Sequence, residues 1–163
     1  MTCRGGVVWF TGLPASGKST LAELVRARLG RPAIILDSDT MREVLEASSY
    51  AAEDRDQFSR VLARLAANLA HQGLVVLVAA TAQRRAHRAL ARELAPRFVE
   101  VWVRTPAAEC ARRDVKGLYA RAGAGEIALP GISTLYEPPL DPDVIAEGGL
   151  DKKAAAAIQA LVP

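Results

Sequence analysis

The feature that most constrains the fold of this chain is the segment GLPASGKST at 12–20, which satisfies the pattern G-x-x-x-x-G-K-[ST]. A short apolar run at 6–11 precedes it, and a helix-like pattern at 19–29 follows it. Glycines in such a loop allow successive backbone N–H groups to point at one place at a helix N-terminus, which makes a cradle for phosphate. Because a strand before the loop and a helix after it are the context that this motif requires, we expect a nucleoside triphosphate to bind here. The alternative is a glycine turn with an incidental lysine.

The chemistry of the loop assigns roles to its residues. Lys18 is expected to reach the β- and γ-phosphates of ATP, and the Ser19 hydroxyl is expected to hold Mg²⁺. The residues that we expect to bind ATP are Gly12, Leu13, Pro14, Ala15, Ser16, Gly17, Lys18, Ser19, Thr20 and Arg113. Arg113 is included because it ends a helix-like segment beside a long loop, where it can clamp phosphate. The alternative for Arg113 is a favourable interaction with the dipole of its own helix.

Strand-like and helix-like segments alternate along almost the whole chain. The expected strands cover 6–11, 33–36, 74–79, 98–103 and 144–146, and the expected helices cover 19–29, 40–47, 53–71, 83–94, 106–113 and 151–161. In the longest of these helices an apolar stripe with helical spacing consists of Phe58, Val61, Leu62, Leu65 and Leu69. Such alternation predicts an α/β fold with a mostly parallel five-stranded sheet.

The segment 114–142 breaks this pattern, because its periodicity fails and glycine and proline become frequent. A long loop inside a compact domain is usually a lid or a binding segment, so we expect it to act as a lid. No repeat and no linker divides the chain, and we therefore expect one domain over 1–163.

Composition and charge exclude several classes of protein. The chain has 163 residues, half of them hydrophobic, and a net charge of +3, which favours a small anionic ligand over nucleic acid as partner. The two cysteines, Cys3 and Cys110, are too few for a disulfide framework or a zinc ribbon. The chain opens without a signal-peptide pattern, and no apolar stretch approaches the roughly 20 residues that span a bilayer. We therefore expect a cytoplasmic protein that makes no contact with a membrane.

Two carboxylates are expected to face the phosphate loop. Asp37 and Asp39 follow the second strand, and Arg42 comes three residues later. Ligands of parallel sheets bind outside the carboxyl ends of the strands, so these side chains share a cleft with the loop. One carboxylate can hold Mg²⁺ or accept a hydroxyl proton while the other contacts substrate. The alternative is that one of them only caps the following helix.

Arg55 and the end of the third strand narrow the function further. Arg55 lies at the edge of an apolar stripe near a helix N-terminus, which favours binding of an anion over a solvated charge. The third strand ends without a carboxylate and runs into Thr81, so the second Mg²⁺ ligand of many phosphate-loop ATPases is absent. This absence argues against motor and switch proteins and favours a small-molecule kinase.

Longer motifs resemble those of adenylylsulfate kinases (APS kinases), which transfer the γ-phosphoryl group of ATP to the 3′-hydroxyl of adenosine 5′-phosphosulfate (APS). The motifs are WFTGL at 9–13 with the phosphate loop, LDSD at 36–39, EDR at 53–55, EVWVRTP at 100–106, CARRD at 110–114 and KGLY at 116–119. The likeness covers about 7–146, and the KGLY motif is much more specific than the phosphate loop. The resemblance implies a three-layer P-loop kinase fold with a lid, ATP and Mg²⁺ as cofactors, and a homodimer.

The resemblance also implies roles for individual residues. Asp37 matches a base or metal partner, and Thr81 stands where some members carry a serine recorded as a phosphorylated intermediate; a plain strand-end threonine is the alternative. The residues that match contacts to the acceptor are Asp39, Arg42, Tyr50, Arg55 and Lys116. Together they imply a small anionic nucleotide as substrate.

Several positions depart from the family pattern, and all of them belong to the acceptor side. Phe58 replaces an amide that touches substrate, Leu129 lies where a lid phenylalanine would cover adenine, and Gly123 replaces a lid arginine. For Phe58 two positions are open, the core or the wall of the acceptor pocket. An APS kinase is therefore the first interpretation, a kinase for another nucleotide-like or anionic metabolite is the second, and a nucleotide-binding module without turnover is the third.

Overall fold

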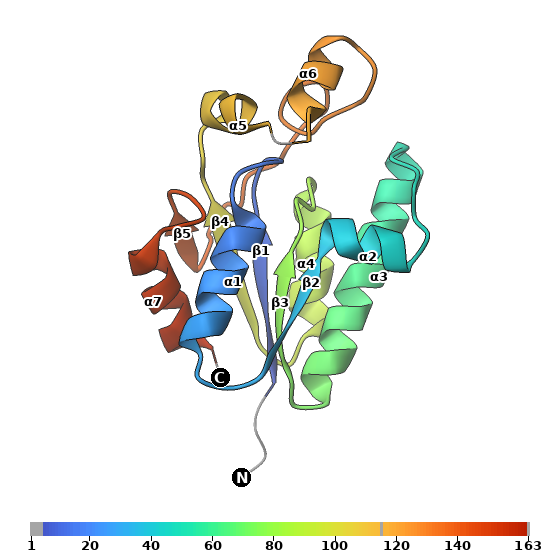
Figure 1. The fold of residues 1–163 in the computed structure, drawn as a ribbon. Coiled ribbons are helices and arrows are strands. Elements are labelled where there is room, and N and C mark those ends of the chain that lie inside the picture. The colour runs from blue at the N-terminus through green and yellow to red at the C-terminus, as the bar shows by residue number, and fades with distance from the viewer. Residues whose placement is uncertain (1–4, 115, 163) are drawn as a thin grey trace.

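The computed structural model describes residues 5–114 and 116–162, and Figure 1 shows their arrangement. The strands are β1 (Gly6–Thr11), β2 (Ala33–Asp37), β3 (Val75–Ala79), β4 (Phe98–Val103) and β5 (Val144–Ala146). They form one five-stranded sheet in the order β2-β3-β1-β4-β5, and every neighbouring pair is parallel. The predicted α/β fold is confirmed, with an all-parallel sheet where a mostly parallel one was expected.

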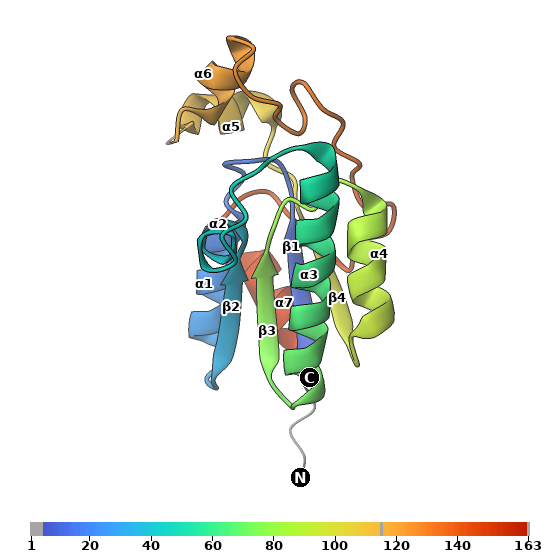
Figure 2. The same cartoon turned by 90° about the vertical axis from the view of Figure 1, so that its right-hand side faces the viewer.

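Helices cover both faces of the sheet. They are α1 (Lys18–Arg28), α2 (Ser38–Val44), α3 (Ala52–His71), α4 (Arg85–Leu94), α5 (Ala107–Arg113), α6 (Leu118–Gly123) and α7 (Lys152–Leu161). Helices α1 and α7 lie on one face and α3 and α4 on the other, which makes three layers, while α5 and α6 lie beyond the carboxyl ends of the strands (Figures 1 and 2). No helix in the described ranges is long and apolar enough to cross a membrane.

The core consists of two apolar clusters, one on each face of β1. Val8 and Phe10 pack toward α1 and α7, while Val7 and Trp9 pack toward α3 and α4. Strand β1 is buried at every position, which explains why its sequence reads as a continuous apolar run rather than an alternating one. Cys110 is buried, as expected, and Cys3 lies outside the described residues.

The buried face of α3 differs from the predicted stripe. Phe58 and Leu62 are buried, but Val61, Leu65 and Leu69 are only partly buried. Between them, alanines at 63, 66, 67 and 70 are buried against the sheet. Small side chains let this long helix lie close to β1 and β3, so the leucines fall at the edges of the contact. The predicted stripe was therefore wrong about which residues form the centre of the buried face.

Two helices, α2 and α4, start two residues away from the predicted first residue. Helix α2 starts at Ser38 rather than at 40, because Asp37 caps it by accepting a hydrogen bond from the backbone N–H of Asp39 at 2.9 Å. Helix α4 starts at Arg85 rather than at 83, because Ala82 has a left-handed backbone with φ of +43°. The segment 80–84 is therefore an irregular connection that leads from the sheet edge into α4.

Helix α6 lies within the expected lid segment, although the frequent glycine and proline residues of that segment gave no indication of a helix. Gly117, with φ of +66°, precedes this helix. Tyr119 and Leu129 then form a small apolar cluster with Cys110 of α5, and Leu13 of the phosphate loop packs against it. The helix is stabilised by this packing rather than by a sequence period, which is why periodicity did not predict it. The lid is thereby anchored on the phosphate loop.

The turn between β5 and α7 supports the phosphate loop from below. A Cβ atom at Gly149 would lie 2.8 Å from the Gly17 carbonyl oxygen and 2.8 Å from Thr20 Cβ. Gly149 therefore permits a close approach between this turn and the start of α1. Asp151 caps α7, as predicted, by accepting from the backbone N–H of Ala154.

We expect Gly149→Ala to weaken nucleotide binding about tenfold or more, because the added methyl group displaces the phosphate loop. Calorimetric titration with ADP measures the effect. Gly123→Ala is the matched control, since a Cβ there meets nothing within 4 Å. Equal affinities of the two variants would contradict the supporting role of Gly149.

Candidate active site

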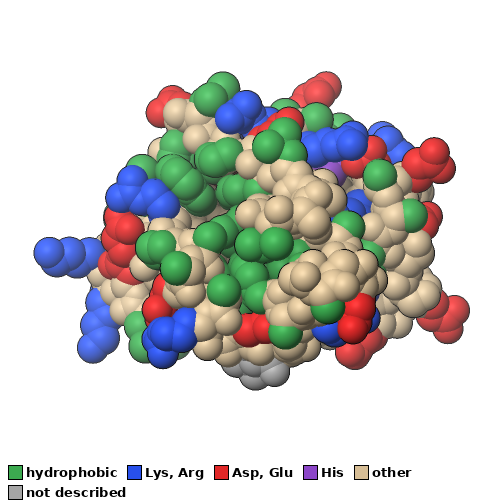
Figure 3. Space-filling view, turned by 90° about the horizontal axis from the view of Figure 1, so that it is seen from above, with side chains coloured by type: hydrophobic (Ala, Val, Ile, Leu, Met, Phe, Trp, Pro, Cys, Tyr) green, Lys and Arg blue, Asp and Glu red, His purple; other side chains and the backbone are tan. Residues whose placement is uncertain are grey.

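A cavity of about 720 Å³ opens at the carboxyl ends of the strands. The phosphate loop, the start of α2, the first turns of α3, the end of β3 and the lid all contribute to its walls. Figure 3 looks down on this face, where hydrophobic side chains gather in the middle and charged side chains lie around them. The site predicted from the sequence is thus assembled from five separate parts of the chain.

The phosphate loop has the geometry of an anion cradle. Ala15 and Gly17 have positive φ values of +61° and +99°, which turn successive backbone N–H groups toward one side. Thr105 holds the loop from below by donating its hydroxyl to the Ser16 carbonyl oxygen at 2.6 Å. Lys18 Nζ donates to the carbonyl oxygens of Gly12 at 3.1 Å and Leu13 at 2.8 Å, so its ammonium lies along the loop.

The surroundings of Lys18 change its protonation. Burial lowers the pKa of its ammonium from 10.5 to about 8, although Asp39 and Asp37 both favour the charged form. A phosphate group beside the ammonium would favour the charged form again. Binding of a nucleotide therefore couples to proton uptake at Lys18 in the pH range above about 8.

Asp37 caps a helix and also contacts the phosphate loop. Its Oδ1 caps α2 through the backbone N–H of Asp39, while its Oδ2 accepts a hydrogen bond from the Ser19 hydroxyl. The hydroxyl and the carboxylate thus lie together at the mouth of the phosphate loop. Hard divalent cations prefer such oxygen donors, so the pair suits Mg²⁺. In the described part of the chain, no three His, Cys, Asp or Glu side chains gather as a metal site.

The lid contacts α2 across the cavity through an ion pair between Lys116 Nζ and Asp39 Oδ2. Both side chains are exposed. The pair therefore contributes little to stability, but it shows that the lid reaches the wall opposite the phosphate loop.

Arg42 lies between two aromatic rings. The centre of its guanidinium is 4.2 Å from the centroid of the Tyr50 ring and 4.1 Å from that of Phe58. It also donates to the carbonyl oxygens of Ala47 at 3.0 Å and Ser49 at 3.1 Å. Phe58 is 7% exposed, belongs to the core and lines the cavity as well, so both positions considered for it apply. The ring of Phe58 positions Arg42 in this chain.

Arg55 joins α3 to the far wall of the cavity. It donates to Gln83 Oε1 at 2.9 Å, to the Ala128 carbonyl oxygen at 2.5 Å and to Thr134 Oγ1 at 3.5 Å. Burial, and then the charge of Arg42, lower the pKa of its guanidinium. Two cations that repel each other are therefore held close together. Such a pair is the electrostatic arrangement of an anion site.

A family model described as adenylylsulphate kinase matches residues 4–147. The chain belongs to the adenylylsulfate kinase (APS kinase) family. It is 46% identical over 150 residues to the adenylyl-sulfate kinase of Paraburkholderia xenovorans (strain LB400), which covers 88% of this chain and 84% of that protein. It is also 48% identical over 149 residues to the adenylyl-sulfate kinase of Chloroflexus aurantiacus, and this match covers 88% of this chain and 80% of that protein.

A solved APS kinase has the same fold. The structure of the Mycobacterium tuberculosis APS kinase CysC in complex with AMPPNP and APS is 42% identical to this chain and superposes with a TM-score of 0.88 over 97% of this chain and 98% of that one. This match confirms the three-layer P-loop kinase fold that the sequence motifs implied.

Two of the predicted APS kinase site residues have other interactions in this structure. Arg113 lines the cavity, but its guanidinium donates to Glu109 Oε1 at 3.1 Å. Its neighbour Arg112 also donates to Glu109, and the two arginines together lower the pKa of that carboxyl to about 2. Thr81 lies at the end of β3 and lines the cavity, where its carbonyl oxygen accepts from the Thr11 hydroxyl at 2.6 Å. Contact of either residue with a ligand stays a prediction.

Sequence reasoning missed two residues of this APS kinase site. Gln83 was expected within a regular helix, but it lies on the irregular connection and accepts the hydrogen bond of Arg55. Tyr119 was noted only within its motif, yet its hydroxyl donates to the Pro14 carbonyl oxygen at 2.7 Å and ties the lid to the phosphate loop. No local sequence pattern predicts either contact, because the partners are 28 and 105 positions apart in the sequence.

We expect the affinity for ADP to fall as the pH rises above about 8, because neutral Lys18 must then take up a proton to contact phosphate. Calorimetry in buffers of different ionisation enthalpy should show proton uptake near pH 9 and much less near pH 7. Lys18→Arg is the control, since arginine stays charged over this range and removes the pH dependence. An affinity of the unmodified protein that is independent of pH would contradict the lowered pKa.

We expect Phe58→Asn to lower the free energy of unfolding by about 3 kcal/mol or more, because it leaves a cavity and buries an amide. Denaturation in urea measures this loss. Phe58→Leu keeps most of the buried apolar surface and loses the ring beside Arg42, so we expect a cost of about 1 kcal/mol. An unchanged stability of Phe58→Asn together with better turnover of APS would instead assign Phe58 to acceptor selection.

Proposed function

We propose that this protein transfers the γ-phosphoryl group of ATP to the 3′-hydroxyl of adenosine 5′-phosphosulfate, giving 3′-phosphoadenosine 5′-phosphosulfate and ADP. One observation carries the proposal: a single cavity has the phosphate loop on one wall and the cations Arg42, Arg55 and Lys116 on the others. Membership of the APS kinase family, and similarity to an APS kinase solved with AMPPNP and APS, support the same conclusion.

The donor half of the cavity binds the triphosphate. Backbone N–H groups of 17–19 point at the β- and γ-phosphates, and Lys18 leaves the loop carbonyl groups to contact them. Arg113 exchanges Glu109 for a phosphate oxygen, which its position on the cavity wall permits. Positioning and charge stabilisation supply most of the catalysis in phosphoryl transfer, so a rigid loop is the main requirement.

The Ser19 hydroxyl and the Asp37 carboxylate are the residues that would hold Mg²⁺. The chemistry that Mg²⁺ would supply there is neutralisation of the charge that develops on the transferred group. Asp37 also orients the acceptor hydroxyl and accepts its proton. Its cap on α2 holds the carboxylate in place for both tasks.

The acceptor half of the cavity binds the anionic part of APS. Arg42 and Arg55 come from α2 and α3, while Lys116 comes from the lid and must exchange Asp39 for the substrate. Tyr50 is 56% exposed, and we propose that its free ring surface stacks on the acceptor base. A phosphorylated Thr81 is not needed for direct in-line transfer between these two halves.

An ADP-release assay with a panel of acceptors tests this function. We expect turnover with APS and much less with other nucleotides, sugars or sugar acids, and none with Lys18→Ala. Preference for a different acceptor would replace APS with that compound, whereas ADP binding without turnover on any acceptor would indicate a nucleotide-binding module. A homodimer and a cytoplasmic location also stay predictions; light scattering of the purified protein tests the former.

We expect Asp37→Asn to lower kcat by roughly 10²-fold or more, the scale of a lost general base. Asparagine caps a helix as well as aspartate does, so the melting temperature should hardly change. Steady-state rates with saturating ATP and APS measure the effect. Asp151→Asn, at the cap of α7, is the matched control and should keep full activity. An Asp37→Asn variant that keeps its full rate would reduce Asp37 to a helix cap.

A further inference from the structure

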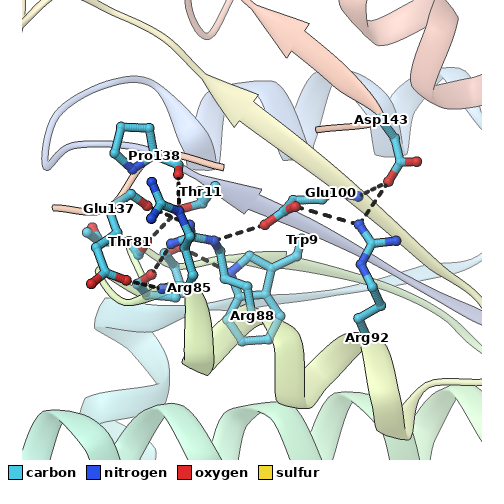
Figure 4. A network of polar contacts seen from close by, with 12 residues as sticks. Trp9, Thr11, Thr81, Arg85, Arg88, Arg92, Glu100, Glu137, Pro138 and Asp143 are labelled. Atoms are coloured by element: carbon cyan, nitrogen blue, oxygen red, sulfur yellow. Dashed lines mark hydrogen bonds and ion pairs between the residues drawn. The ribbon is translucent and has the colours of Figure 1, made fainter. Parts of the chain in front are cut away.

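In residues 80–83 of the irregular connection after β3, every backbone carbonyl oxygen accepts a hydrogen bond. We call these residues the pinned segment. The four donors are Trp9 Nε1 to Ala80 at 3.3 Å, Thr11 Oγ1 to Thr81 at 2.6 Å, Arg88 Nη1 to Ala82 at 2.5 Å, and the Glu137 backbone N–H to Gln83 at 2.8 Å. Figure 4 shows most of these residues converging from β1, α4 and the last part of the lid segment. A segment without helical or strand pairing is thus given one defined backbone path.

The path needs this support because of Ala82. Its φ of +43° places the Cβ of an L-residue in an unfavourable position, which persists only where the surroundings hold it. The strongest candidate for that support is Arg88, whose Nη1 binds the carbonyl oxygen of the same residue.

Arg88 uses all three of its nitrogen atoms. Its Nε donates to Glu100 Oε1 at 2.9 Å and its Nη2 donates to the Glu137 carbonyl oxygen at 2.6 Å, besides the contact from Nη1. The side chain is 2% exposed, so this guanidinium is a buried charge that is neutralised by one carboxylate and directed at two backbone oxygens. The planar guanidinium of arginine can reach three partners at once, whereas the single nitrogen of a lysine cannot.

The same contacts hold the last part of the lid segment. We call residues 136–138 the strap. Arg85 donates its backbone N–H to Glu137 Oε2 at 2.7 Å and its Nε to the Pro138 carbonyl oxygen at 2.8 Å (Figure 4). The Tyr136 hydroxyl lies 3.0 Å from Thr11 Oγ1. Strap and pinned segment are therefore joined side by side, with Arg88 between them.

The pinned segment faces the acceptor half of the cavity. Thr81 and Gln83 line the cavity, and Gln83 Oε1 accepts the hydrogen bond from Arg55 Nη1 at 2.9 Å. We propose that Arg88 is a positioning residue: by joining the pinned segment to the strap, it places Gln83 so that Arg55 points at an anionic group of the acceptor. This inference rests on the proposed function.

Arg88→Lys tests the inference, because it keeps a positive charge for Glu100 but loses the fork. We expect the KM for APS to rise about tenfold and the KM for ATP to change by less than about twofold. Arg92→Lys is the matched control: Arg92 lies on the same helix and also pairs with Glu100, at 3.6 Å, but it does not contact the pinned segment. It should leave both constants unchanged.

Two further variants separate positioning from general destabilisation. In an Arg55→Ala background, Arg88→Lys should add no further rise in the KM for APS, since the effect passes through Arg55. If Arg88→Lys does not fold, Gln83→Ala removes the acceptor of the Arg55 hydrogen bond and should raise the KM for APS selectively.

Equal changes in both constants, an unchanged KM for APS in a folded Arg88→Lys or Gln83→Ala variant, or additive effects with Arg55→Ala would overturn the positioning role. The unmodified protein is assayed first. Absence of APS turnover there would overturn the proposed function, and with it the acceptor that this inference names, whereas loss of the variant effects alone would overturn only the role of Arg88.

Discussion

Strand β1 lies between β3 and β4 and is buried on both faces, so the loop that follows it starts from the central strand of the sheet. Thr105 and the close approach of Gly149 hold that loop from the neighbouring strand ends. Tyr119 then ties the lid to it. The donor half of the site depends on this burial, because phosphoryl transfer tolerates little displacement of the groups that hold the phosphates.

The two halves of the cavity are built by different means. The donor half is made of backbone N–H groups in one short segment, with Lys18 and Ser19 beside them. The acceptor half is made of long side chains from α2, α3 and the lid, and each is oriented by a partner distant in the sequence. Arg42 is held by aromatic rings and Arg55 by Gln83. The orientation of these side chains therefore depends on residues outside their own elements.

Sequence patterns predicted all five strands, the phosphate loop and the carboxylates that face it. They placed the buried face of α3 on leucines, whereas alanines form its centre, because a pattern of hydrophobicity does not show how closely a helix can approach a sheet. They also missed α6, whose six residues are stabilised by contacts with Cys110 and Leu13 rather than by a period of their own. Both errors concern packing between elements.

The function class was readable in the chain itself, since a phosphate cradle and its lysine are formed by consecutive residues whose backbone geometry is local. The positions of the cations in the acceptor half could not be read from the sequence. Asp37 both caps a helix and faces Ser19, Phe58 belongs to the core and also contacts Arg42, and Arg88 donates to Glu137, which is 49 positions away. Contacts of this kind arise only when the sheet and its helices bring distant residues together, so they belong to the tertiary structure alone.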